Sequence, residues 1–142
     1  MENLNTYSYS AGQILNMDET CIYLDCPSNY TYSLRGVRRV KASTAGGERT
    51  RLSSTFTAAA NGQKLPIFSI VPRVNSIPEL DSIDNMQFDY KTLSTFNDSM
   101  ILKYLERIIL PYMQSKSYER VLLILDRATC HTTSRVSHFD FD

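Results

Sequence analysis

The chain has 142 residues, 42% of them hydrophobic and 11% aromatic, and its 15 basic residues balance 15 acidic ones. This length suits a single domain with a substantial core, and the composition excludes collagen-like and disordered chains. No run of about 18 apolar residues occurs, which excludes a membrane-spanning helix. The first residues lack the basic and apolar regions of a secretory signal, so the sequence predicts an intracellular globular domain.

The cysteines favour reduced thiols over a disulfide framework. Cys21, Cys26 and Cys130 are odd in number and lack CxxC spacing. Together with His131 and His138 they do not show the spacing of a zinc ligand set. The sequence alone therefore predicts no zinc site.

Charges are segregated along the chain despite the neutral total. Residues 35–73 contain eight basic residues and one acidic residue, Glu48. Such a block indicates a surface that faces phosphate groups, although solvated faces of strands and loops would give the same count. The candidate nucleic-acid contacts in this block are Arg35, Arg38, Arg39, Lys41, Arg49 and Arg51.

Two short apolar segments each end in a carboxylate. Residues 121–126 form an unbroken apolar run that ends in Asp126, which is typical of a parallel strand buried on both faces. Residues 13–18 form a second run that ends in Asp18. If these strands are neighbours, their acids meet at a sheet edge where ligands bind, whereas the alternative for each is a turn or capping role. Glu19 is expected to point to the opposite face of its strand from Asp18.

The middle of the chain predicts a hairpin and a helix. Asn61-Gly62 joins strands at 49–60 and 64–71, and Pro66 restricts the second strand to an edge, a bulge or a start position. The acidic stretch 72–96 has no clear period and is interpreted as a surface insertion. A helix then follows a cap at 97–99, with apolar side chains at 101, 104, 105, 108 and 109, and Pro111 is expected to bend or end it.

Five motifs occur in the order of a known family. The chain resembles the DDE endonuclease domain of pogo, Tigger and jerky type transposases, in the wider mariner group, over residues 13–135. The segments that carry the resemblance are Asn16-Met-Asp-Glu-Thr20, Pro27-Ser-Asn29, Gly46-Gly-Glu-Arg-Thr-Arg-Leu-Ser53, Ala58-Ala-Ala-Asn-Gly-Gln-Lys-Leu-Pro66 and Leu122-Leu-Ile-Leu-Asp-Arg-Ala-Thr-Cys-His131.

The resemblance implies an α/β fold of the ribonuclease-H-like type, with an antiparallel hairpin, parallel central strands and flanking helices. It implies that Asp18 and Asp126 are the first two catalytic, metal-binding acids. It also implies that His131 lies near Asp126 and supports this metal ligand without binding the metal itself, although a structural bond to a backbone carbonyl is the alternative for this histidine. It also implies Mg²⁺ or Mn²⁺ as cofactor, DNA as partner, and the nucleus as location. The sequence does not indicate an oligomeric state.

Two departures from the family accompany the resemblance. The family's third acid follows the second by a few tens of residues, whereas this chain ends 16 residues after Asp126 and offers no match. The family's helix usually carries a tryptophan where Tyr104 stands. The resemblance therefore implies a lead-in at 1–12 and a C-terminally incomplete domain at 13–142, with a divergent tail at 136–142 and weak or absent cleavage. The alternative is a non-catalytic, domesticated DNA-binding or interaction module.

Overall fold

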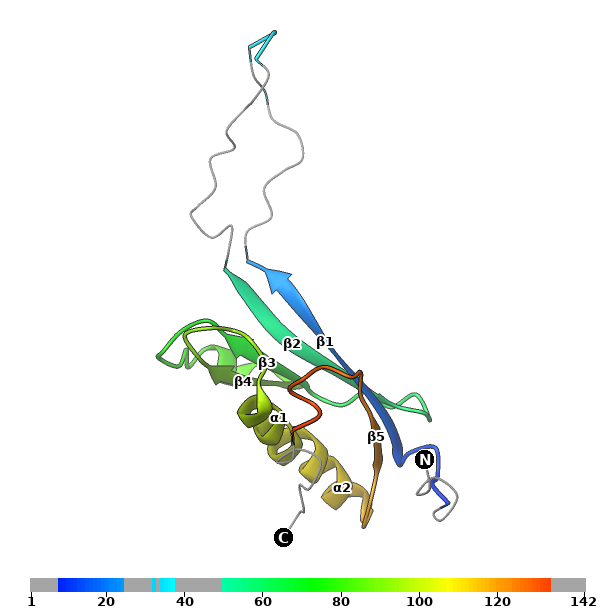
Figure 1. The fold of residues 1–142 in the computed structure, drawn as a ribbon. Helices are drawn as coiled ribbons and strands as arrows, with labels where there is room; N and C mark the ends of the chain where they lie inside the picture. Colours follow the sequence, from blue (N-terminus) through cyan, green and yellow to red (C-terminus); the bar gives the residue numbers. More distant parts are fainter. Residues whose placement is uncertain (1–7, 25–31, 33, 38–49, 134–142) are drawn as a thin grey trace.

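The computed structural model describes residues 8–24, 32, 34–37 and 50–133. Within them, five strands form one mixed sheet in the order β4-β3-β2-β1-β5 (Figure 1). The strands are β1 (Ile14–Tyr23), β2 (Arg51–Ala59), β3 (Ile67–Val71), β4 (Met86–Tyr90) and β5 (Leu122–Ile124), and a short 3-10 turn, η2 (Leu80–Ser82), precedes β4. The tail at 136–142 lies outside the described residues.

The predicted hairpin is confirmed. Strands β2 and β3 pair antiparallel, and the Asn61-Gly62 turn connects them. Gly62 has a φ of 89°, a left-handed conformation that glycine adopts without steric cost. The side chain of Asn61 accepts a hydrogen bond from the backbone N–H of Gln63 at 3.0 Å. Pro66 lies directly before β3, where the sheet does not need the N–H that proline lacks.

The stretch interpreted as a surface insertion contains a strand, so that prediction is wrong for residues 86–90. Strand β4 pairs in parallel with β3, from Met86 opposite Ile67 to Tyr90 opposite Val71. One of its two buried residues, Asp89, is charged, and the Nζ atom of Lys103 lies 2.6 Å from its carboxylate. Because this compensating partner comes from a distant helix, the local pattern could not reveal a buried strand.

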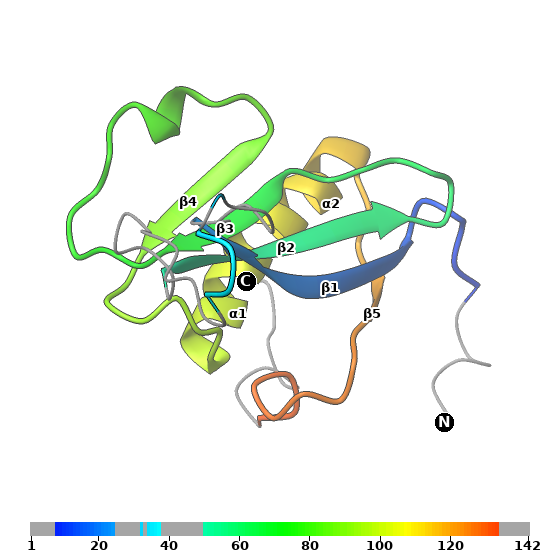
Figure 2. The same cartoon turned by 90° about the horizontal axis from the view of Figure 1, so that it is seen from above.

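One long helical segment covers a single face of the sheet (Figure 2). It consists of α1 (Asp98–Tyr104), a π turn, η3 (Leu105–Ile109), and α2 (Leu110–Lys116). Asn97 caps it by accepting a hydrogen bond from the N–H of Met100 at 3.1 Å, as predicted. None of the described helices is long and apolar enough to cross a membrane.

Pro111 does not end the helix, which continues to Lys116. The N–H of Leu110 donates to the carbonyl of Leu105, five residues back, so the turn before the proline is widened. Pro111 therefore falls in the first turn of α2, where a missing N–H is tolerated. The expectation that this residue terminates the helix is wrong for that reason.

The core lies between this helical segment and one face of the sheet. On β1, Leu15 and Met17 point into the core, whereas Asn16 and Asp18 alternate to the opposite face and are exposed. The prediction that the strand at 121–126 is buried on both faces is wrong for the described part of the chain. There β5 is an edge strand, and Ile124 is 45% exposed. Its predicted parallel pairing with β1 is confirmed.

Candidate active site

The register between two strands brings the predicted acids to the same level of the sheet. Strand β5 pairs in parallel with β1, and the last pair in the ladder joins Asn16 to Ile124. Asp18 and Asp126 each follow this pair by two residues, so both stand just beyond the carboxyl end of β5. Both residues are exposed. The arrangement places two carboxylates at the edge where α/β sheets bind ligands.

Hydrogen bonds fix one oxygen of each carboxylate. The Oδ1 atom of Asp18 accepts from the N–H of Glu19 at 2.9 Å, and Oδ1 of Asp126 accepts from the N–H of Ala128 at 3.1 Å. The Nδ1 atom of His131 lies 2.7 Å from the same Asp126 oxygen. Among the described residues, no donor is bound to either Oδ2 atom. Each aspartate can therefore offer an oxygen to a cation.

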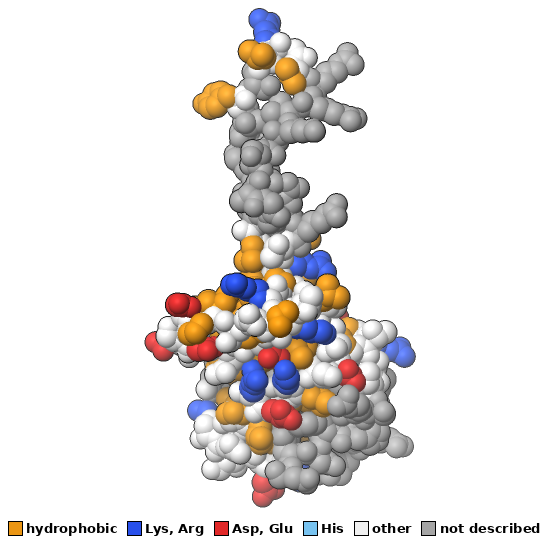
Figure 3. Space-filling view, turned by 90° about the vertical axis from the view of Figure 1, so that its left-hand side faces the viewer, with side chains coloured by type: hydrophobic (Ala, Val, Ile, Leu, Met, Phe, Trp, Pro, Cys, Tyr) orange, Lys and Arg blue, Asp and Glu red, His pale blue; other side chains and the backbone are white. Residues whose placement is uncertain are grey.

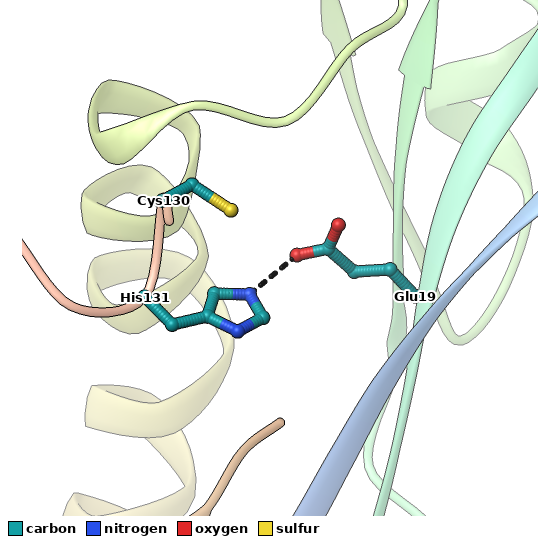
Figure 4. A group of neighbouring side chains, drawn as sticks. All are labelled: Glu19, Cys130 and His131. Atoms are coloured by element: carbon teal, nitrogen blue, oxygen red, sulfur yellow. Dashed lines mark hydrogen bonds and ion pairs between the residues drawn. The ribbon is translucent and has the colours of Figure 1, made fainter. Parts of the chain in front are cut away.

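His131 contacts Asp126 through one ring nitrogen and Glu19 through the other, and Figure 4 shows the contact with Glu19. Glu19 points to the helix side of β1, as its alternation with Asp18 predicts, and its Oε1 atom lies 2.8 Å from Nε2 of His131. On the other side of the ring, Nδ1 contacts both the carboxylate and the backbone carbonyl of Asp126, at 2.7 and 3.2 Å. The imidazole is 4% exposed. His131 thus makes both contacts that the sequence left as alternatives.

The pKa values of His131 and Glu19 are both raised, for different reasons. Burial lowers the pKa of His131, but its hydrogen bonds to Glu19 and Asp126 outweigh burial and raise that pKa above its ordinary value. Burial raises the pKa of Glu19, His131 partly offsets this effect, and the negative charges of Asp126 and Asp18 add to it. The pair therefore retains protons to a higher pH than isolated groups would.

Cations flank the acids on both faces of the sheet. A depression of about 700 Å³ on the face away from the helices is lined by Asn16, Asp18, Phe56, Thr57, Ala58, Lys64, Leu65, Ile67 and Asn85. Sequence reasoning did not single out Lys64 as a site residue. The register of the strands accounts for the position of Lys64. Ala58 forms a bridge with Lys64 on one side and pairs with Asn16 of β1 on the other, so Lys64 lies across the sheet from Asn16.

A smaller cavity of about 200 Å³ includes Glu19 on the other face. Its lining residues are Glu19, Thr20, Cys21, Arg51, Ser53, Thr95 and Phe96. Arg51, the first residue of β2, thereby shares a cavity with Glu19, and Arg35 is exposed in a turn with Gly36. The other predicted nucleic-acid contacts, Arg38, Arg39, Lys41 and Arg49, lie outside the described residues.

Curated relatives of this chain include two transposon-derived proteins. The chain is 28% identical over 131 residues to the pogo transposable element with KRAB domain of Mus musculus, and 26% identical over 132 residues to the Homo sapiens protein of that name. These alignments cover 92% and 93% of this chain but 21% and 22% of the relatives. The chain thus spans about a fifth of their length.

Two solved structures share the fold. The Mos1 transposase paired-end complex with left transposon end has a TM-score of 0.52 at 16% identity, covering 89% of this chain and 32% of that one. The mariner Mos1 paired end complex with Mg has a TM-score of 0.53 at 18% identity, covering 96% and 34%. This likeness confirms the predicted ribonuclease-H-like α/β fold. The profile of the DDE superfamily endonucleases matches residues 49–141, and the chain belongs to that family, with pogo-type relatives.

Proposed function

We propose that this transposase-derived domain binds DNA and holds a divalent cation between Asp18 and Asp126. The observation that carries the proposal is the parallel register of β1 and β5, whose last pair, Asn16 opposite Ile124, lies two residues before each aspartate. Family membership and the fold shared with a transposase–transposon complex support DNA as the partner. They also support the nucleus as the place where the domain works.

The donor set suits Mg²⁺ or Mn²⁺. Mg²⁺ prefers oxygen ligands, keeps several waters and is commonly bound by one or two carboxylates together with substrate phosphate oxygens. Asp18 and Asp126 are exposed and supply only oxygen. Bound ions of this kind activate the attacking oxygen and stabilise the leaving oxygen in phosphodiester cleavage.

The surrounding side chains position the acids and attract phosphate. His131 and the N–H of Ala128 both contact Oδ1 of Asp126, so these contacts do not occupy its Oδ2 atom. Lys64 shares a depression with Asp18, and Arg51 lines a cavity on the opposite face together with Glu19. These two cations can offset the repulsion between the acids and a DNA backbone.

We further propose that cleavage by this chain is weak or absent. Glu19 is the remaining acid beside this pair among the described residues, and its carboxylate points to the helix face, where it contacts His131. The Glu19 carboxylate could not bind the same ion as Asp18 without losing its contact with His131. A cation with two protein carboxylates is bound less firmly than one with three, so its placement for cleavage is less exact.

The charge distribution favours the segment 35–51 as the main DNA contact. Among the described residues on the side that Figure 3 shows, basic and acidic side chains are interspersed with hydrophobic ones and form no uniformly positive surface. In the sequence of segment 35–51, by contrast, the basic residues are accompanied by one acidic residue, Glu48. Binding through such residues is independent of sequence and falls steeply with salt. A non-catalytic DNA-binding module is therefore the second candidate function.

Nicking of supercoiled DNA with Mg²⁺ or Mn²⁺, measured beside salt-dependent DNA binding, tests the proposal. Asp18→Asn and Asp126→Asn are the test variants, and Asp81→Asn, an exposed acid near β4, is the matched control. Nicking that both test variants lose and the control keeps would support catalysis. Salt-sensitive binding without nicking, kept or slightly strengthened in Asp126→Asn, would support the second candidate. Absence of DNA binding, or nicking that both test variants retain, would refute the proposal.

A further inference from the structure

Three side chains with different donor atoms converge behind the acid pair (Figure 4). Glu19 comes from the middle of β1, whereas Cys130 and His131 come from the turn that follows β5. A carboxylate oxygen, the Sγ atom and a ring nitrogen all lie within 4.8 Å of one another. Glu19 and Cys130 are half-buried, and His131 is buried.

We propose that Glu19, Cys130 and His131 bind a borderline-soft divalent ion of the zinc type, at a site separate from the Asp18–Asp126 pair. Thiolate and imidazole select Zn²⁺ and its neighbours, whereas Mg²⁺ prefers a set of oxygens. Tetrahedral Zn²⁺ with Zn–N and Zn–O bonds near 2.0 Å and a Zn–S bond near 2.3 Å places its ligand atoms about 3.3–3.6 Å apart. In the metal-free cluster all three ligand atoms lie within 4.8 Å of one another and Nε2 lies 2.8 Å from the Glu19 oxygen, so the side chains would have to adjust by about 1 Å to hold the ion.

The other nitrogen of His131 supports this assignment. Metal-binding histidines usually donate their second ring N–H to a carboxylate or a backbone carbonyl, which fixes the tautomer and the ring orientation. Nδ1 of His131 already faces both kinds of acceptor on Asp126, at 2.7 Å for the carboxylate and 3.2 Å for the carbonyl. Nε2, which points to Glu19, is therefore the nitrogen presented to a metal.

Glu19, Cys130 and His131 supply three of the four ligands of a tetrahedral ion. Three protein ligands and one open position are typical of zinc sites that exchange a water or a substrate group, whereas purely structural sites are closed by four protein ligands. With a metal ion bound to Nε2 of His131, the Nδ1–H group would donate a hydrogen bond to Asp126. One imidazole therefore links the zinc-type site to the acid pair.

Cobalt(II) titration of the reduced, metal-free chain tests the proposal, because a thiolate bound to Co²⁺ gives a near-ultraviolet charge-transfer band. Cys130→Ser removes the sulfur, and Cys21→Ser is the matched control at the other described cysteine. Zn²⁺ affinity is measured by competition with a chromophoric chelator. Circular dichroism of each variant checks that it folds.

We expect the band in the wild-type chain and in Cys21→Ser, and its loss in folded Cys130→Ser with a fall in Zn²⁺ affinity of at least tenfold. Asp126→Asn should keep the band and weaken Zn²⁺ about 10–100-fold, as the loss of a partner of a metal ligand does. Asp18→Asn should keep the band, which separates this site from the proposed Mg²⁺ site. No band in the wild type, or a band that Cys21→Ser loses and Cys130→Ser keeps, would overturn the proposal.

Discussion

The Nδ1 atom of His131 lies 2.7 Å from the Oδ1 atom of Asp126, and on the far side of the ring Nε2 lies 2.8 Å from Glu19. One buried imidazole thereby ties an acid at the end of β5 to an acid in the middle of β1. The contact matters for both strands, because their pairing in the sheet covers only three residues of β5.

Replacing His131 with alanine should affect both stability and metal binding. Glu19 would lose its partner while half-buried, which costs about 1–3 kcal/mol in the free energy of unfolding. Asp126 would lose the group that orients it, so Mg²⁺ affinity should fall about 10–100-fold. Urea unfolding and calorimetric Mg²⁺ titration measure the two effects. Thr129→Ala, an exposed change in the same turn, is the control, and unchanged Mg²⁺ affinity in His131→Ala would contradict the positioning role.

The metal-free protein should lose stability as the pH rises, through the Glu19–His131 pair. Both pKa values are raised, so the folded state binds more protons than the unfolded state and the free energy of unfolding falls with pH. The His131 contribution is fully present below pH 6.5, the pKa of an unperturbed histidine, and disappears as the pH passes its raised folded value. Unfolding in EDTA across this range should show the advantage of the wild type over His131→Gln shrinking. An advantage that grows with pH would contradict the assignment.

Tyr104 and Thr57 share a buried hydrogen bond of 2.8 Å between the helix and β2. Tyr104 is fully buried and Thr57 is 4% exposed. Thr57→Val leaves the phenol without this partner and should cost about 1–3 kcal/mol in unfolding free energy, whereas Thr57→Val with Tyr104→Phe removes both polar groups and should cost less. Urea unfolding of the two single variants and the double variant measures the coupling. Strictly additive effects would show that the hydrogen bond does not contribute.

Lys103 should stabilise the edge strand β4. Its Nζ atom lies 2.6 Å from Asp89, which is buried in that strand, and the next cation, Arg107, is 4.0 Å away. Lys103→Met should lower the unfolding free energy by about 1–2 kcal/mol and speed amide exchange in Met86–Tyr90. Lys116→Met, an exposed change on the same helical segment, is the control. Equal exchange in the two variants would show that Lys103 does not stabilise β4.

Local sequence patterns predicted those features whose cause is local. The Asn61-Gly62 turn, the Asn97 cap and the apolar stripe of the helix depend on neighbouring residues, and all three are present. Strand β4 was missed because the burial of Asp89 depends on a cation 14 residues later in the chain. The continuation of the helix past Pro111 could not be predicted with certainty because it depends on a π turn at Leu105–Ile109, which has no recognisable sequence pattern.

The candidate site was predictable in part. Asp18 and Asp126 could be nominated because each ends an apolar run, and each follows the last residue pair of the β1–β5 ladder by two residues. The approach of Glu19 to His131 could not be read from the sequence, because 112 residues separate them and the contact depends on the path of the turn after β5. Cys130 joins them for the same reason, so cysteine spacing gave no sign of the cluster.

Mg²⁺ binding by the acid pair is the most direct test of the account. Calorimetric titration of the wild type, Asp18→Asn, Asp126→Asn and the exposed control Asp81→Asn compares affinities under one set of conditions. Each test variant should lose more than about tenfold in affinity, because even the partners of metal ligands typically contribute that much, and the control should match the wild type. Wild-type affinity in Asp18→Asn would show that the two carboxylates do not share an ion, and the central claim would be wrong.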